Sequence, residues 1–375
     1  MKQKKTRILK VNKVKLIVAG GGTGGHIFPA VAIANAVRKA SPDTEVLFVG
    51  AKGKMEMEKV PKEGYRIIGL DIAGFDRNSM LKNLSLPFKL IKSFIQAGKI
   101  LKEFKPSVVV GVGGYASFPV LYMAQRKGIP TLIQEQNSHA GKSNQQLGKK
   151  AKAICVAYEG MDKFFPKDKI ILTGNPIRAS ISTNEISKEK GIEKFGLNST
   201  KKIVFAFGGS LGAKSINETL ADQFKEVIAS DAQLLWQTGT SFFEKAKEAV
   251  KGYESQVKVF EFIQEMDYAY AAADVIISRA GASSISELCI VGKPVVFVPF
   301  PYASEDHQTS NAMALVKINA ALMVKDHETK SDLLAKVKSL LYDTTQQELI
   351  KKNISTLAIQ HADENIASKI IEMCN

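Results

Sequence analysis

The chain has 375 residues, 45% of them hydrophobic and 24% charged, and its 52 Lys and Arg against 37 Asp and Glu give a formal net charge of +15. This ordinary globular composition excludes a disordered, collagen-like or disulfide-stapled chain, and the length favours two domains. The charge predicts an anionic partner: nucleic acid, an anionic membrane surface or a phosphate-rich substrate. The excess lies in residues 1–178, with 31 basic and 12 acidic residues (+19), whereas the remainder has 21 and 25 (−4).

Apolar runs typical of buried strands alternate with segments of helical spacing along the chain. In the first half, strands are predicted at 14–20, 45–50, 107–114, 129–137 and 169–176, and a helix at 26–40. The pattern restarts with a strand, glycine loop and helix over 202–220, followed by strands at 233–239, 257–263, 273–281 and 293–300. This alternation predicts an α/β fold of two Rossmann-like, doubly wound domains facing across a cleft, with a hinge near 175–180.

Cysteine and histidine spacing predicts neither a disulfide framework nor a metal site. Cys155, Cys289 and Cys374 are far apart with no CxxC, which fits a reducing cytosol. The five histidines lack metal-ligand spacing, and no D-x-D is present. No apolar run reaches the roughly 18 residues that a membrane span needs, so we expect no spanning segment.

Three glycine-rich segments each follow a predicted strand and open a predicted helix. They are GGGTGGHIFP (20–29), GGSLGA (208–213) and SRAGASSISE (278–287). Backbone N–H groups at such helix starts can bind a phosphate. Glu287 lies one turn into the third helix, where it could accept hydrogen bonds from both ribose hydroxyls, or where it could simply favour the helix start.

Other interpretations of these loops remain open at this stage. Residues 20–25 match GxGxxG, but the second strand ends VGAKGK without the carboxylate that a dinucleotide site needs. Gly208 to Gly212 read G-x-S-x-G, as in a serine hydrolase, although no HGGG-type segment precedes them. The glycines could also serve only close strand–helix packing. No Walker GxxxxGK[ST] is present, which argues against a P-loop enzyme.

Seven segments in order resemble the successive motifs of the MurG family, the bacterial UDP-N-acetylglucosamine:lipid I N-acetylglucosaminyltransferases. They run from Gly20 to Ala312: GGGTGGHIFPA, GVGGYASFP, EQN, GNPIR, GGSLGA, SRAGASSISE and DHQTSNA. The resemblance implies a GT-B fold and inverting transfer of N-acetylglucosamine from its UDP carrier to lipid I, which forms lipid II for peptidoglycan. It implies no cofactor and no obligatory active-site metal.

The resemblance also implies a different function for each part of the chain. Residues 1–178 would form the acceptor- and membrane-binding domain, residues 179–356 the UDP-sugar-binding domain, and residues 357–375 a helix that returns to the first domain. The protein would lie peripherally on the cytoplasmic face of the bacterial cell membrane, serve cell shape and division, and meet cell-wall and division proteins. No nucleic-acid partner is expected.

Carried over residue by residue, the resemblance assigns the site. The donor would contact Thr23, Gly24, Gly25, Asn137, Arg178, Ser210, Ile263, Ala282, Ser283, Ser284, Ile285, Ser286, Glu287 and Gln308. The acceptor would contact His26, Gly113, Gly114 and Tyr115. Arg178 and helix N-termini would stabilise the departing UDP in place of a metal. His26 is the first candidate for the general base and Glu135 is the alternative; His26 could instead only orient the acceptor.

Residues 72–105 are the candidate membrane contact. From Arg77 to Lys105 there are seven basic residues and one acidic residue, interleaved with Leu, Ile and Phe. An apolar face flanked by Lys and Arg is typical of a peripheral membrane helix, although the same apolar face could belong to the domain core.

Two other functions remain as alternatives: a GT-B transferase with a glycolipid or soluble glycoside acceptor, and a nucleic-acid-binding protein. Against the latter, no RRM, KH or helix-turn-helix pattern is present.

Overall fold

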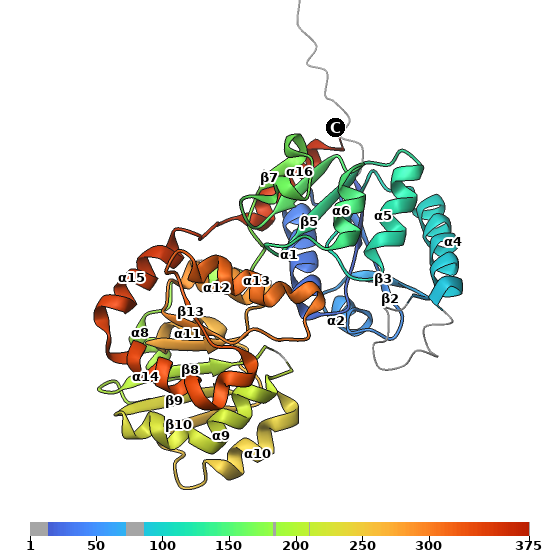
Figure 1. Cartoon of the computed structure of the whole chain (residues 1–375). Coiled ribbons are helices and arrows are strands. Elements are labelled where there is room, and N and C mark those ends of the chain that lie inside the picture. The colour runs from blue at the N-terminus through green and yellow to red at the C-terminus, as the bar shows by residue number, and fades with distance from the viewer. Residues whose placement is uncertain (1–13, 73–85, 183–184, 210, 375) are drawn as a thin grey trace, which may run out of the picture.

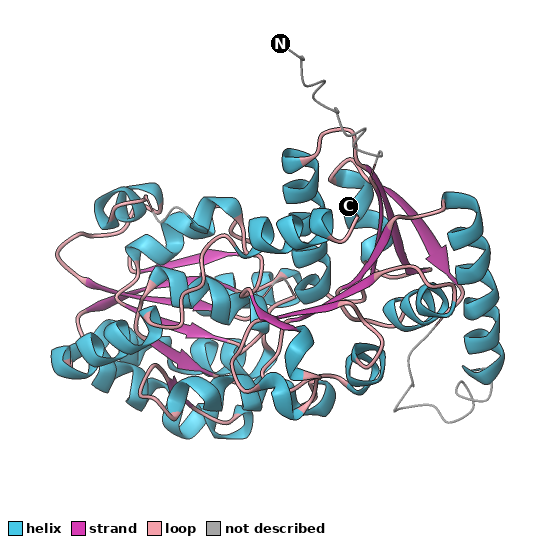
Figure 2. Ribbon diagram, turned by 90° about the horizontal axis from the view of Figure 1, so that it is seen from above, coloured by secondary structure: helices cyan, strands magenta, loops and turns pink. Residues whose placement is uncertain are grey.

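The chain forms two parallel β-sheets, each covered by helices on both faces (Figures 1 and 2). The structure is a computed structural model that describes residues 14–72, 86–182, 185–209 and 211–374. The first sheet has seven parallel strands in the order β3-β2-β1-β4-β5-β6-β7. Its strands are Lys15–Ala19 (β1), Glu45–Ala51 (β2), Arg66–Leu70 (β3), Val108–Gly111 (β4), Thr131–Glu135 (β5), Ala153–Val156 (β6) and Ile170–Leu172 (β7).

Two helical layers bury the faces of this sheet. The helices are Gly24–Ala40 (α1), Glu56–Lys62 (α2), Leu86–Phe104 (α4), Ser117–Arg126 (α5) and Lys142–Gly148 (α6), with short turns Met161–Lys163 (η1) and Lys167–Lys169 (η2). The chain's last helix, Ala362–Glu372 (α16), packs on α1. Side chains of α1, α2 and α16 form one core cluster with the sheet, and those of α4, α5 and α6 form another. The central strands β1, β2, β4 and β5 are buried on both faces, which is why they read as unbroken apolar runs.

The second sheet has six parallel strands in the order β10-β9-β8-β11-β12-β13. Its strands are Lys202–Phe207 (β8), Ala232–Gln237 (β9), Val257–Phe260 (β10), Val275–Ser278 (β11), Val295–Phe297 (β12) and Leu322–Met323 (β13). The order places β8 and β11 side by side at the centre, where the direction of strand progression reverses. Ligands of such sheets bind outside the carboxyl ends of the strands at that point.

Helices again cover both faces of this sheet. They are Ala179–Ser182 (α7), Lys188–Lys194 (α8), Lys214–Ala229 (α9), Phe243–Ala249 (α10), Met266–Ala272 (α11), Ala282–Val291 (α12), His307–Val316 (α13), Leu334–Tyr342 (α14) and Thr344–Ser355 (α15). Short turns are Thr240–Phe242 (η3), Ser304–Asp306 (η4), Asp326–Glu328 (η5) and Thr329–Leu333 (η6). Helices α9, α10 and α14 share one core cluster, and α11, α12 and α13 share the other.

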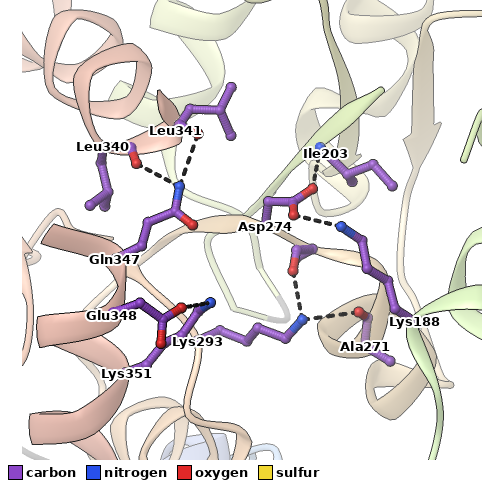
Figure 3. A network of polar contacts seen from close by, with 11 residues as sticks. Lys188, Ile203, Ala271, Asp274, Lys293, Leu340, Leu341, Gln347, Glu348 and Lys351 are labelled. Carbon is purple, nitrogen blue, oxygen red and sulfur yellow. Dashed lines mark hydrogen bonds and ion pairs between the residues drawn. The ribbon is translucent and has the colours of Figure 1, made fainter. Parts of the chain in front are cut away.

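A polar network fixes the end of the second sheet that lies away from its strand carboxyl ends (Figure 3). Asp274, just before β11, accepts a hydrogen bond from Lys188 Nζ of α8 at 2.6 Å. Lys293 Nζ donates to the carbonyl groups of Ala271 and Ala273 at 3.1 and 2.8 Å, and so satisfies carbonyls at the end of α11. Burial lowers the pKa of Lys293 to about 8, against the opposing effect of Asp274. The network holds α8 and α11 against the sheet and has a structural role.

The predicted fold class of two parallel α/β domains is confirmed. Three strands were not predicted: β3, β6 and β13. Strand β3 lies at a sheet edge with partly exposed residues, so its sequence lacks the apolar run of a central strand. Strand β13 has two residues, too few to show a pattern. The length of β6, four residues, does not explain why it was missed, because β4 and β11 are equally short and were predicted. The predicted strand at 169–176 contains only the three residues of β7.

Candidate functional site

The loops at the carboxyl ends of both sheets meet around helices α1, α12 and α13, which lie between the two sheets (Figure 1). Helix α1 follows β1 in the first sheet, α12 follows β11 in the second, and α1 contacts α12. Hydrogen bonds join the two domains near this point. Asn311 Oδ1 of α13 accepts from the Ser138 amide at 2.9 Å, and Asn175 Nδ2 donates to Ser286 Oγ at 3.0 Å.

On the first-domain side, the loop after β1 interlocks with the loop after β4. The amide of Gly21 donates to the carbonyl of Gly113 at 3.2 Å. Thr23 is the N-cap of α1, so Gly24 and Gly25 form the first turn, and its side chain makes no capping hydrogen bond. The His26 amide donates to the Thr23 carbonyl at 3.1 Å, whereas the amides of Gly24 and Gly25 need partners from outside the helix. Gly114 and the 48% exposed Tyr115 continue the second loop.

His26 is partly buried at the start of α1. Its Nδ1 lies 3.3 Å from Thr23 Oγ1. Burial, and then the neighbouring His307 of α13, lower the pKa of His26 to about 4, while the Gly21 carbonyl and the Glu56 carboxylate raise it. The imidazole is therefore neutral near pH 7 and one of its ring nitrogens can accept a proton, but the low pKa makes it a weaker base than an ordinary histidine.

Glu135, the alternative base, is held in a different way. Its carboxylate is 2% exposed, and Oε1 accepts from the amide of Asn137 at 3.1 Å and from Asn137 Nδ2 at 3.2 Å. Oε2 accepts from Asn144 Nδ2 at 2.8 Å and from the Gly141 amide at 3.3 Å. Both oxygens are engaged in shaping the loop after β5, so this geometry suits a positioning role better than proton transfer. Burial raises the pKa of Glu135, and these hydrogen bonds oppose the rise.

The start of α12 supplies a cluster of polar groups on the second-domain side. Ala282 begins the helix, and Ser283 Oγ is buried with no hydrogen-bond partner among the described residues. Ser284 follows Ser283 and is partly exposed, whereas Ile285 is buried in the domain core. Such a helix start, with its free amides and a buried hydroxyl, can bind a phosphate group.

Glu287 and Arg178 meet at this helix. The Glu287 carboxylate is 7% exposed, accepts from the Tyr270 hydroxyl at 2.9 Å and lies 3.6 Å from Arg178 Nε. Burial raises the pKa of Glu287, while Arg178 and the Tyr270 hydrogen bond lower it. The Arg178 guanidinium also lies 5.6 Å from the centre of the Phe28 ring of α1. Arg178 thus contacts both domains.

Two further residues predicted to bind the UDP-sugar donor are oriented by hydrogen bonds from or to neighbouring residues. The backbone amide of Ile263 donates to Gln237 Oε1 at 2.9 Å, so among its backbone groups the carbonyl is left for a ligand. Gln308 Oε1 accepts from the Phe300 amide at 2.9 Å, which leaves Nε2 as the group that can donate to a ligand. Ser210 lies outside the described residues.

A cavity of about 640 Å³ separates the domains on another side of α12. Ile285, Ser286 and Cys289 line it, together with Tyr158 and Met313. At 100° per residue, Ile285 and Cys289 lie on the side of α12 opposite Glu287, and Ser286 lies about 100° from it. The cavity is therefore distinct from the cluster around Glu287 and Arg178.

Comparison with known proteins supports one family. Residues 16–156 match the glycosyltransferase family 28 N-terminal domain and residues 203–369 match its C-terminal domain. The chain is 50% identical to the Parabacteroides distasonis UDP-N-acetylglucosamine--N-acetylmuramyl-(pentapeptide) pyrophosphoryl-undecaprenol N-acetylglucosamine transferase, over 97% of this chain and 99% of that protein. The corresponding Phocaeicola vulgatus transferase is 52% identical over 96% of this chain and 97% of its own length.

The chain belongs to this transferase family. The crystal structure of Acinetobacter baumannii MurG is similar, with a TM-score of 0.77 and 28% identity, over 96% of this chain and all of that chain. The kitacinnamycin glycosyltransferase, at 14% identity and a TM-score of 0.71, shares the fold. The family assigned from the seven sequence motifs is confirmed, and the dinucleotide, hydrolase and nucleic-acid interpretations are set aside.

Several contacts in the site were not expected from the sequence. Tyr270 and Phe28 reach Glu287 and Arg178, Asn311 joins the loop after β5, and Glu56 bonds the loop before α1. Phe28 and Asn311 lie within the motifs GGGTGGHIFPA and DHQTSNA, but nothing in those motifs names their partners. Tyr270 and Glu56 lie outside all seven motifs.

Proposed function

We propose that this chain transfers N-acetylglucosamine from UDP-N-acetylglucosamine to lipid I with inversion at the anomeric carbon, forming lipid II. The observation that carries the proposal is 50% identity over 97% of the chain to an enzyme of that name. The Glu287–Arg178 pair at the start of α12 supplies a chemically fitting donor site.

The donor half of the proposal uses the second domain and Arg178. The ribose hydroxyls donate to the buried Glu287 carboxylate, and the diphosphate lies at the α12 N-terminus near Ser283 and Arg178. The family resemblance assigns Ser210 to the same proposed diphosphate site. A carboxylate that is desolvated and already oriented makes stronger hydrogen bonds than one in water.

The N-acetylglucosamine and the uracil of the donor are recognised by groups that hydrogen bonds to neighbouring residues hold in place. The uracil N3–H donates to the Ile263 carbonyl, and Gln308 Nε2 donates to a sugar hydroxyl. Asn137 approaches the sugar from the first domain, held there by Glu135. Because the Gln308 carbonyl oxygen is engaged by a backbone amide, its donor group is the one presented to the ligand.

The acceptor half uses the two interlocked loops of the first domain. The family resemblance assigns Gly24 and Gly25 to the donor; we propose that amides around them, at the start of α1, also bind the lipid pyrophosphate together with the loop of Gly113, Gly114 and Tyr115. The C4 hydroxyl of the acceptor sugar attacks the anomeric carbon while its proton passes to neutral His26. The bond from that carbon to the UDP oxygen breaks on the opposite face.

We propose that no active-site metal is required, because the residues can stabilise the departing diphosphate themselves. The N-terminal amides of α12 carry a partial positive charge, and Arg178 adds a full one. Arg178 is 33% exposed at its side chain and lies beside Glu287, so the diphosphate would compete with that carboxylate for the guanidinium.

Helix α4 supports a peripheral position on the cytoplasmic face of the cell membrane. Its second half is anchored in the core by Ala97, Ile100, Leu101 and Phe104, and Ser93 is buried just before them. In its first half Phe88, Ile91 and Ile95 are 76%, 60% and 69% exposed, and their spacing places them on one stripe. Lys92 and Lys99 flank this stripe. No described helix is long and apolar enough to cross a membrane.

Release of UDP tests the proposal. UDP-N-acetylglucosamine is incubated with the protein, with and without a water-soluble lipid I analogue. UDP release that depends on the analogue, with lipid II analogue as product, is expected. Release that is equally fast without the analogue would contradict transfer to lipid I.

A further inference from the structure

We propose that Glu56 is a positioning residue for the glycine loop that carries Thr23 and His26. It acts through the loop backbone without touching substrate. The inference rests on the proposed function, because it assigns a role in acceptor binding to that loop.

Glu56 ties two loops together through one buried carboxylate. The side chain lies in the first turn of α2 and is 1% exposed. Its Oε2 accepts from the amide of Gly22 at 2.7 Å, and its Oε1 accepts from the amide of Ala51 at 2.9 Å. The end of β2 is thereby joined to the loop that follows β1. Both hydrogen bonds are charge-assisted because the acceptor is a carboxylate, and burial strengthens them because it removes competition from water.

The surrounding backbone is shaped to admit this carboxylate. A Cβ atom at Gly21 would lie 2.3 Å from Glu56 Cδ, and one at Gly50 would lie 2.5 Å from Glu56 Cγ. Neither position has room for a side chain while Glu56 keeps its place. Glycine at position 50 is therefore explained by packing against Glu56, and glycine at position 21 by that packing together with a φ of +140°, so neither requires contact with a ligand.

The hydrogen bonds fix which amides of the loop can bind an anion. The amide of Gly21 is taken by the Gly113 carbonyl, and that of Gly22 by Glu56. The next amides, at the start of α1, are left to bind the acceptor pyrophosphate. In dinucleotide-binding folds an acidic residue after the second strand binds a ribose. Here the carboxylate supplied after β2 is buried under the loop and bonds the loop itself.

The variant Glu56→Gln tests this role with little change in size. One oxygen becomes an NH₂ group facing a backbone N–H, so one hydrogen bond is lost. We expect kcat/KM for a lipid I analogue to fall at least about tenfold, mainly through a higher KM, since a hydrogen bond to a buried charge is lost. UDP affinity by calorimetry should stay within about twofold of wild type. The matched control is Glu58→Gln on the same helix, whose carboxylate is exposed and paired with Lys62.

A second variant, Gly50→Ala, displaces Glu56 without removing any polar group. It should reproduce the selective loss of acceptor binding, and the double variant with Glu56→Gln should lose less than the product of the two effects. If Glu56→Gln does not fold, Gly50→Ala still tests the positioning role of Glu56. Unchanged acceptor kinetics in either folded variant, or equal losses of UDP and acceptor affinity, would overturn the inference.

Hydrogen exchange separates this inference from the proposed function. The amide of Gly22 should be protected in the wild type and exchange faster in Glu56→Gln, whatever reaction the protein catalyses. Failure of the wild type to transfer to lipid I would refute the proposed function alone. Unaltered exchange at Gly22 would refute the role of Glu56 alone.

Discussion

Replacing Glu287 by Gln tests the proposed donor site most directly. The carboxylate is 7% exposed, and its two oxygens face the Tyr270 hydroxyl at 2.9 Å and Arg178 Nε at 3.6 Å. Gln keeps the size of the side chain but removes its charge. A hydrogen bond to a charged group contributes about 1.5–3 kcal/mol, so UDP should bind roughly 10- to 150-fold more weakly.

Calorimetric titration of UDP into wild type and Glu287→Gln measures this loss. Tyr270→Phe is the control, because it removes the hydroxyl partner of Glu287 and leaves the charge for the ribose. Its effect on UDP affinity should be smaller. A Glu287→Gln protein that melts like wild type and binds UDP within about twofold of wild type would refute the ribose role.

The pH dependence of UDP binding provides a second measurement on the same residue. Burial raises the pKa of Glu287 above the usual 4.5. The protonated carboxyl loses its charge, so UDP affinity should fall as pH falls, starting above the pH at which an exposed Glu titrates. Glu287→Gln should lack this dependence, and its persistence in that variant would assign it to another group.

Three further outcomes are expected. His26→Ala should lower turnover about 10²- to 10⁴-fold and leave UDP affinity unchanged. The acid limb of the wild-type pH profile of kcat/KM should lie near pH 4. Single-turnover rates of His26→Ala near those of wild type would exclude His26 as the base. Replacing Phe88, Ile91 and Ile95 by Ser should abolish flotation of the protein with anionic liposomes at low salt, and should leave transfer to a soluble acceptor unchanged. Unaltered flotation would argue against contact between α4 and the membrane. Ile366→Ala, at a fully buried position of α16, should cost about 2–5 kcal/mol in denaturant unfolding, and a loss below 1 kcal/mol would mean that α16 docks only weakly.

Much of the fold follows from local pattern. Strands β1, β2, β4, β5, β8, β9 and β11 are buried on both faces, and their apolar runs identify them without tertiary information. Strand β13 pairs along only two residues, Leu322 and Met323, and the helix pattern around it gives no sign of a strand. Its existence depends on the adjacent β12, which offers an open edge.

The candidate site was predicted in part, because the motifs name residues but not their partners. Glu287 and Arg178 stand 109 positions apart in the chain, and only the fold brings them within 3.6 Å. Glu135 belongs to a motif and was a candidate base. Two of its four hydrogen bonds come from Asn137 of the same motif, and the other two come from Gly141 and Asn144, which carry no distinguishing pattern of their own.

The net charge and its concentration in the first 178 residues are properties of the sequence alone, and so are the order of strands and glycine loops and the motifs that identify the family. These features depend on residue type and short-range spacing. The tertiary structure decided which face of α4 is exposed, which loop amides are already engaged, and that the carboxylate beneath the first glycine loop is Glu56. Burial and hydrogen bonding depend on neighbours distant in the chain, which no local pattern records.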